Sequence, residues 1–241
     1  MIRKNIPNFV TLFNLLSGSI SIVFAFGNDL VMAAIFIGLA AIFDFLDGMM
    51  ARLLNARSPI GLQLDSLADV ISFGLAPGFI VYHLMTEAMN TPMVFVNDFN
   101  VALLPAFLIP AFSALRLAKF NIDDRQLDSF IGLPTPANAL FFASLPLVAH
   151  QAALSHQIII TGLLNSYWVL LSITMFFCYL LVSPLPLMAF KFKTISLKEN
   201  LPRYLFLASA IVLFFLLKYH ALPLIILLYL VISVALSKIK G

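Results

Sequence analysis

Long apolar stretches follow one another along almost the whole chain, separated by short polar segments. A helix needs about 20 apolar residues to cross a membrane. By this criterion the pattern predicts eight spanning helices, at residues 8–26, 30–54, 61–86, 99–119, 134–153, 157–182, 203–218 and 221–238. Almost nothing remains for a soluble domain, so we expect an all-α, polytopic membrane helical bundle that forms one domain over residues 1–241.

Composition supports a membrane protein. Hydrophobic residues make up 62% of the chain and charged residues 10%, with a mean hydropathy of +1.03, whereas soluble domains carry about 25% charged residues. The single cysteine, Cys178, lies in an apolar stretch, which excludes a disulfide within the chain and a thiolate metal site. The basic residues form no continuous patch, so we expect no nucleic-acid partner.

The basic residues instead indicate an orientation. If the amino terminus is cytoplasmic, every Lys and Arg except Lys218 falls on the cytoplasmic side of the predicted spans. Cytoplasmic loops are enriched in these residues. We therefore expect a protein of the cytoplasmic (inner) membrane with both termini inside.

Four aspartates interrupt the second and third spans. Asp44 and Asp47 are three residues apart and Asp65 and Asp69 are four apart, so each pair shares one face of a helix. An antiparallel pair of helices with a turn near residues 55–60 brings all four together. Each carboxylate costs roughly 2.5–3.5 kcal/mol in a membrane, so the group calls for cations. Oxygen ligands suit Mg²⁺ or Mn²⁺, and two ions fit four carboxylates better than one.

Two glycines and an arginine extend this array toward the cytoplasmic face. Gly48 and Gly61 lack a Cβ and permit close approach of a ligand to the backbone. Arg52 lies one turn beyond Gly48, where its guanidinium can bind a phosphate oxygen. Together with metal ions, these residues indicate a diphosphate site.

The aspartates, glycines and arginine follow the pattern D-x2-D-G-x2-A-R-x8-G-x3-D-x3-D. The residues at its fixed positions are Asp44, Asp47, Gly48, Ala51, Arg52, Gly61, Asp65 and Asp69. In this respect the chain resembles the CDP-alcohol phosphatidyltransferase family. Further blocks, at residues 7–14, 65–77, 116–121 and 132–137, resemble the branch that uses serine as acceptor, although Lys119 departs from the residue common there.

The resemblance implies roles for the motif residues. Asp44, Asp47 and Asp65 are expected to bind two divalent ions, and Asp69 to share an ion and act as the general base. The expected CDP-diacylglycerol-binding residues are Asn8, Thr11, Gly48, Ala51, Arg52, Ser58 and Gly61. The resemblance also implies a homodimer. Within one chain, we expect a catalytic core at about 7–182 and supporting helices at about 203–238.

The expected reaction transfers the phosphatidyl group of CDP-diacylglycerol to L-serine. Because serine carries a carboxylate, it requires a cationic partner, and Arg116 is the first candidate, with Asn121 and Thr135 as hydrogen-bonding neighbours. The same chemistry with glycerol 3-phosphate, inositol phosphate or choline remains an alternative. A divalent-cation transporter is a second one, which Arg52 disfavours because a cation pathway has no use for a phosphate-binding arginine.

Overall fold

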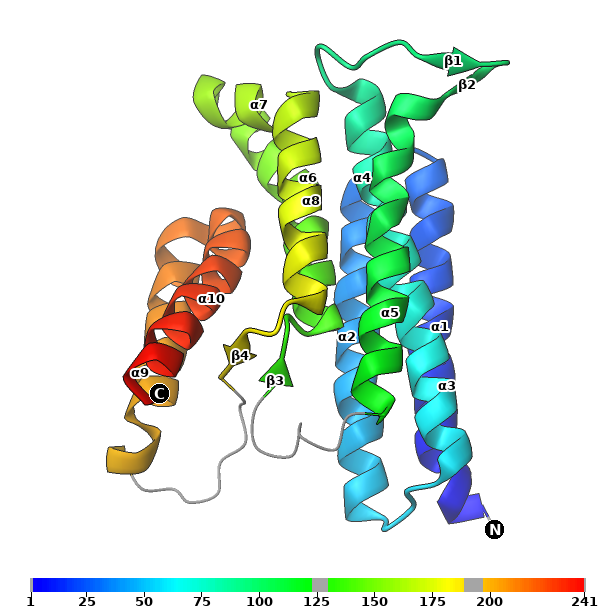
Figure 1. The fold of residues 1–241 in the computed structure, drawn as a ribbon, viewed down its shortest axis with the longest axis vertical. Helices are drawn as coiled ribbons and strands as arrows, with labels where there is room; N and C mark the ends of the chain where they lie inside the picture. The colour runs from blue at the N-terminus through cyan, green and yellow to red at the C-terminus, as the bar shows by residue number, and fades with distance from the viewer. Residues whose placement is uncertain (1, 123–129, 189–196, 241) are drawn as a thin grey trace.

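The computed structural model describes residues 2–122, 130–188 and 197–240, which form a bundle of helices with their axes roughly aligned (Figure 1). The helical elements of the first half of the chain, which includes the aspartate motif, are α1 (Ile2–Phe26), α2 (Leu30–Leu53), α3 (Pro59–Asp69), the π-helical turn η1 (Val70–Leu75), α4 (Ala76–Glu87), the 3₁₀ turn η2 (Val101–Phe107) and α5 (Leu108–Ile122). The remaining helical elements are α6 (Thr135–Leu154), α7 (Ile158–Leu164), α8 (Tyr167–Val182), α9 (Leu197–Leu217), the 3₁₀ turn η4 (Lys218–His220) and α10 (Ala221–Lys240). Two short antiparallel pairs join β1 (Phe95–Val96) to β2 (Phe99–Asn100) and β3 (Phe130–Ile131) to β4 (Pro186–Leu187).

The all-α membrane bundle predicted from the sequence is confirmed. Within the described residues, six helical stretches are long and apolar enough to cross a membrane, and Tyr167–Val182 is a shorter apolar helix. The last stretch, Asn200–Leu236, contains both α9 and α10, which η4 separates. The start of α1 and the end of α10 lie toward the same end of the bundle (Figure 1).

The prediction of a single sixth span at 157–182 was wrong. The structure divides this segment into α7 and α8 at Asn165 and Ser166, where the backbone leaves the helical conformation. The reason is a contact distant in sequence: the Met89 amide donates to the Asn165 carbonyl (2.7 Å), and the Tyr167 amide donates to the Met89 carbonyl (3.3 Å). The loop after α4 therefore satisfies backbone groups that a continuous helix would have paired internally.

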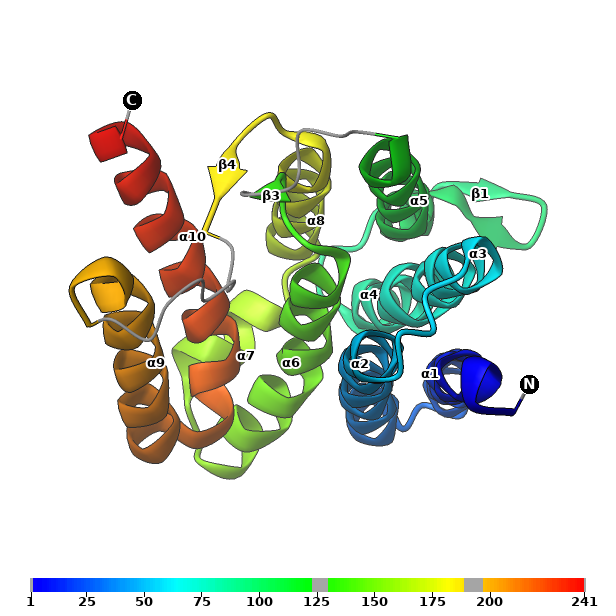
Figure 2. The same cartoon turned by 90° about the horizontal axis from the view of Figure 1, so that it is seen from below.

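The helices form a central bundle with a flanking hairpin. Seen along the bundle, α1 to α6 and α8 lie together, while α9 and α10 stand at one side (Figure 2). The hairpin reaches the bundle mainly through α10, which contacts α6 and β4. In the core, the rings of Phe141 and Phe177 stack with centroids 3.9 Å apart, which joins α6 to α8.

Several of the basic residues that indicate the orientation of the chain lie outside the described part of the structure. Arg125, Lys191 and Lys193 lie outside the described residues. The described side chains also exclude those of Arg3, Lys4, Lys198, Lys238 and Lys240. The cytoplasmic position of the termini therefore stays a prediction.

A very close contact between α1 and η1 positions the motif region. Gly18 lies against Ser72, and a Cβ at Gly18 would overlap both the side chain and the Cα of Ser72. The Ser72 hydroxyl donates to the Asn14 carbonyl on α1 (2.9 Å). This contact places one turn of α1 directly beside the end of α3, where Asp69 lies.

Replacing Gly18 by Ala is expected to lower the apparent unfolding temperature of the purified protein by several degrees. The added methyl group must push α1 away from η1, and overpacking of this kind costs about 1–3 kcal/mol. Gly38→Ala is the matched control, because no neighbouring atom outside its own helix turn lies within 4 Å of that position among the described residues. Equal unfolding temperatures for the two variants would contradict the close packing described here.

Candidate active site

The motif helices α2 and α3 carry two aspartates each, and α1 packs against both helices. Three carboxylates form a tight group: one oxygen from each of Asp44, Asp47 and Asp65 lies within 4.8 Å of the others. The i, i+3 spacing places Asp44 and Asp47 on one face of α2, and the turn after α2 brings Asp65 of α3 to them. The predicted clustering of these three residues is thus confirmed in geometry.

The donor set fits a divalent metal ion. Asp47 is 5% exposed, and its Oδ2 atom is buried without a hydrogen-bond partner among the described residues. A buried carboxylate oxygen is costly unless a cation or a donor compensates it. Three close carboxylates provide the oxygen ligands that Mg²⁺ and Mn²⁺ prefer. The three aspartates can therefore hold a metal ion.

Asp69 lies beside this group, close enough to Asp44 for a side-chain interaction, although it is not one of the three acids that converge within 4.8 Å. It is buried at the end of α3, 6% exposed, and its Oδ1 accepts a hydrogen bond from Asn14 Nδ2 of α1 (3.3 Å). The other three carboxylates are close enough to act on it electrostatically, with Asp44 the strongest. Asp69 is thus adjacent to the three grouped aspartates and is also held by Asn14 of α1, in a position suited to a role of its own.

A buried cation faces Asp69 from α5. Arg116 is 6% exposed and interacts electrostatically with Asp69 and with Tyr229 of α10. Its guanidinium carbon lies 5.3 Å from the centroid of the Phe120 ring. Its Nε atom has no hydrogen-bond partner among the described residues. A buried guanidinium with an unpaired N–H group is suited to bind an anion.

The other two predicted acceptor residues are placed differently from each other. Thr135, at the start of α6, is completely buried, and its hydroxyl has no partner within the described part of the chain. Asn121 instead donates from Nδ2 to the hydroxyl of Ser66 on α3 (2.8 Å). Thr135 is therefore open to a ligand, whereas Asn121 ties α5 to the motif helix.

Two further polar side chains were not assigned to a site from the sequence. Asn138, one turn after Thr135 on α6, is completely buried, and neither atom of its side-chain amide has a hydrogen-bond partner in the described residues. Ser113, one turn before Arg116, is also completely buried with a free hydroxyl there. Asn138 is three residues from Thr135 and Ser113 three residues from Arg116, and this spacing, which puts each pair on one helix face, could have indicated them from the sequence. Buried polar groups normally find partners, so these positions point to a bound ligand or water.

The two motif glycines have different surroundings. At Gly48 no atom outside its own helix turn lies within 4 Å of where a Cβ would be, considering the described residues. Open space at this position fits the approach of a ligand. At Gly61 a Cβ would lie 3.0 Å from Asn8 Oδ1 and 3.1 Å from Ser58 Oγ. The missing side chain of Gly61 therefore makes room for protein groups.

The remaining residues predicted to bind the donor surround the same end of α2 and α3. Ser58 caps α3 by accepting from the Gly61 amide (3.0 Å). Arg52 is exposed, and its Nε donates to the Gly48 carbonyl (3.0 Å), which leaves its terminal nitrogens toward solvent. Thr11 donates to the Pro7 carbonyl (3.1 Å) and also interacts with Asp47. Ala51 is half-buried beside Arg52.

Comparison with known proteins agrees with this arrangement. The family described as CDP-alcohol phosphatidyltransferase matches residues 4–180, which include every aspartate of the site. The chain belongs to the CDP-alcohol phosphatidyltransferase family. The match ends within α8, so the α9–α10 hairpin lies beyond it.

Curated relatives of this chain are named CDP-diacylglycerol–serine O-phosphatidyltransferase. The protein of Helicobacter pylori (strain ATCC 700392 / 26695) is 40% identical over 136 residues, 56% of this chain and 54% of the relative. That of Methanocaldococcus jannaschii is 38% identical over 143 residues, 58% and 60% of the two chains. That of Bacillus subtilis (strain 168) is 35% identical over 131 residues, 54% and 69%. The similarity thus spans little more than half the length of the first two relatives.

Asp47→Asn is expected to weaken Mn²⁺ binding by this protein at least tenfold, because it removes the negative charge of the most buried carboxylate of the group. The measurement is a Mn²⁺ titration followed by electron paramagnetic resonance of the free ion. Asp29→Asn is the matched control: Asp29 caps α2 at the other end of that helix by accepting from the Met32 amide, and asparagine caps equally well. An unchanged affinity in Asp47→Asn would exclude Asp47 as a ligand.

Proposed function

We propose that this protein transfers the phosphatidyl group of CDP-diacylglycerol to the hydroxyl of L-serine, yielding phosphatidylserine and CMP. The observation that carries the proposal is the pairing of a carboxylate cluster with a buried arginine: Asp69, beside the three grouped aspartates, interacts with Arg116, whose Nε atom has no hydrogen-bond partner in the described chain. A substrate with a diphosphate and a substrate with a carboxylate can meet at this point. The names of the relatives support the same reaction.

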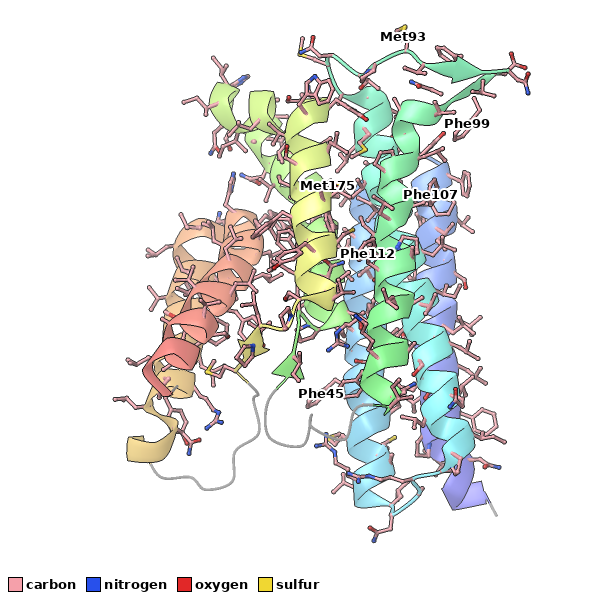
Figure 3. The ribbon with its side chains drawn as sticks, in the orientation of Figure 1. Phe45, Met93, Phe99, Phe107, Phe112 and Met175 are labelled. Carbon is pink, nitrogen blue, oxygen red and sulfur yellow. The ribbon has the colours of Figure 1, made fainter. Side chains whose placement is uncertain are left out.

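The donor is a lipid, and the cluster is reachable from the lipid-facing surface. Phe45, between two of the aspartates, is 62% exposed, and Leu67, between the other two, is 65% exposed (Figure 3 labels Phe45). Apolar side chains exposed on a membrane protein face lipid. The acyl chains can therefore remain in the bilayer while the cytidine diphosphate group reaches Gly48 and Arg52.

The aspartates supply the chemistry of the transfer. Asp44, Asp47 and Asp65 would hold two divalent ions, Mg²⁺ or Mn²⁺, with Asp69 sharing one, and such ions neutralise the diphosphate and the leaving group. Asp69 accepts the proton of the serine hydroxyl, and its hydrogen bond from Asn14 fixes the carboxylate for that task. The serine oxygen forms a bond to the phosphorus that carries diacylglycerol, and the bond from this phosphorus to CMP breaks. CMP leaves with the electron pair.

The acceptor pocket is assigned to the polar residues around Arg116. The guanidinium binds the carboxylate of serine, while Thr135 and Asn138 supply unpaired hydrogen-bonding groups. A phosphorylated acceptor would require more positive charge than this, because Lys119, the next cation on α5, is exposed. Choline has no carboxylate for Arg116 to bind. Serine therefore fits the pocket better than these alternatives.

The proposal includes the setting of the enzyme. The protein resides in the cytoplasmic membrane, with both termini and the aspartate cluster toward the cytoplasm, as the distribution of Lys and Arg favours. It acts as a homodimer, as its family resemblance implies.

With CDP-diacylglycerol, Mg²⁺ or Mn²⁺ and a panel of acceptors, the purified protein is expected to release CMP with L-serine and not with glycerol 3-phosphate, inositol phosphate or choline. Asp69→Asn should lower the rate at least about 100-fold, because general-base catalysis contributes roughly 10²–10⁴-fold. Asp29→Asn should retain the rate. Release with another acceptor would refute the serine assignment. If no acceptor causes CMP release and the protein takes up Mn²⁺ into proteoliposomes, the enzyme hypothesis would be rejected in favour of a divalent-cation transporter.

Arg116→Ala is expected to raise the KM for serine by about 10- to 100-fold, since a hydrogen bond to a charged group contributes about 1.5–3 kcal/mol. The KM for CDP-diacylglycerol should change little. Lys119→Gln, an exposed cation one turn away, is the matched control and should keep the parental serine KM. If Arg116→Ala keeps the parental KM for serine, the assignment of Arg116 to the acceptor site is wrong.

A further inference from the structure

A cavity with a mixed polar and apolar border lies at the opposite end of α6 from the aspartate cluster. Its volume is about 430 Å³, and it is bordered by Gln151 near the end of α6, Gln157 before α7, and the turn η4 between α9 and α10. Gln151 lies 16 residues after Thr135, which corresponds to about 24 Å along the helix. The cavity is therefore separate from the proposed active site and close to the other membrane surface.

Polar atoms in this cavity lack partners. Gln157 Oε1 and His220 Nε2 are both buried without a hydrogen-bond partner among the described residues. Lys218 also borders the cavity and has an exposed side chain. Lys218 adopts a φ of +51°, which is uncommon for a residue other than glycine. The turn thus holds a cation and an imidazole at the cavity in a specific backbone conformation.

Lys218 is also the exception in the charge distribution. It is the one Lys or Arg of the sequence that the predicted topology places opposite the cytoplasmic side. None of the described residues that border the cavity is acidic. A positive group without a nearby counter-charge, together with unpaired hydrogen-bonding groups, suits an anion. The rest of the border is apolar and includes Ile160, Leu216 and Leu224.

We propose that this cavity binds a phosphate group at the membrane surface opposite the aspartate cluster, carried there by a phospholipid. Lys218 and His220 contact the phosphate oxygens, Gln151 and Gln157 provide amide contacts to the polar head, and the leucines contact the glycerol and the start of the acyl chains. The bound lipid connects η4 to the end of α6, and so holds the α9–α10 hairpin against the bundle. This site does not depend on the reaction catalysed at the aspartates.

The test measures lipid retention by native mass spectrometry. Delipidated protein in detergent is titrated with phosphatidylglycerol, and in a second arm inorganic phosphate is added as competitor or alone. The wild type should retain one phosphatidylglycerol, and Lys218→Asn should weaken that binding about tenfold. Asparagine removes the charge but tolerates a positive φ, so the turn is preserved. Lys218→Arg should keep the affinity.

Controls separate the site from general charge effects. Lys119→Gln removes an exposed lysine on α5, and His156→Asn removes an exposed histidine outside the cavity border. Both of these control variants should bind lipid like the wild type. The test variant His220→Asn should bind lipid more weakly. Gel filtration and unfolding temperature establish that each variant is folded. Displacement by inorganic phosphate would identify the free ion as a competing source for the same site. Equal lipid retention in the wild type, Lys218→Asn and His220→Asn would overturn the proposal.

Discussion

The cost of holding four carboxylates close together beside hydrocarbon governs this structure. Asp47 and Asp69 are almost completely buried, and three of the four acids converge within 4.8 Å. Such a group is stable only if neighbouring elements or bound cations offset its repulsion and desolvation. The bundle contributes an amide donor from α1 and a guanidinium from α5 on the Asp69 side. On the side of the other three acids, a metal ion is the compensation that fits.

The sequence predicts the helices and the aspartate group well because both depend on local spacing. Apolar length marks a spanning segment, and separations of three and four residues put acids on one face. Prediction from the sequence fails where the structure depends on contacts between residues that are distant in sequence. The break between α7 and α8 depends on hydrogen bonds to Met89, and the role of α1 as the support of both motif helices depends on the fit of Gly18 against Ser72. The closeness of Gly61 to Asn8 is also a contact distant in sequence, while the predicted role of Gly61 in donor binding stays a prediction.

The proposed acceptor pocket shows a second limit of prediction from sequence. Asn138 and Ser113 are single polar residues in apolar helices, and their sequence positions do not reveal whether they face lipid or the interior. Both are completely buried in helices that meet η1. Ser113 lies one turn from Arg116 on α5, Asn138 lies one turn from Thr135 on α6, and Ser113, Asn138 and Thr135 all have side-chain polar atoms without partners among the described residues. The aspartate motif was recognisable because its pattern is dense, whereas the acceptor residues are scattered over two helices.

The α9–α10 hairpin contacts both of the proposed sites. Between its polar ends and its turn, its sequence is mostly apolar, which favours a supporting role, and the family match ends before it. Yet Tyr229 of α10 interacts with Arg116 and donates from its hydroxyl to the Met188 carbonyl (3.0 Å), while Lys218 and His220 border the cavity at the other end. The surroundings of the acceptor arginine are therefore partly built by a segment outside the shared region. If lipid at the turn holds the hairpin in place, the position of Tyr229 beside Arg116 depends on that lipid too, because α10 follows η4 directly.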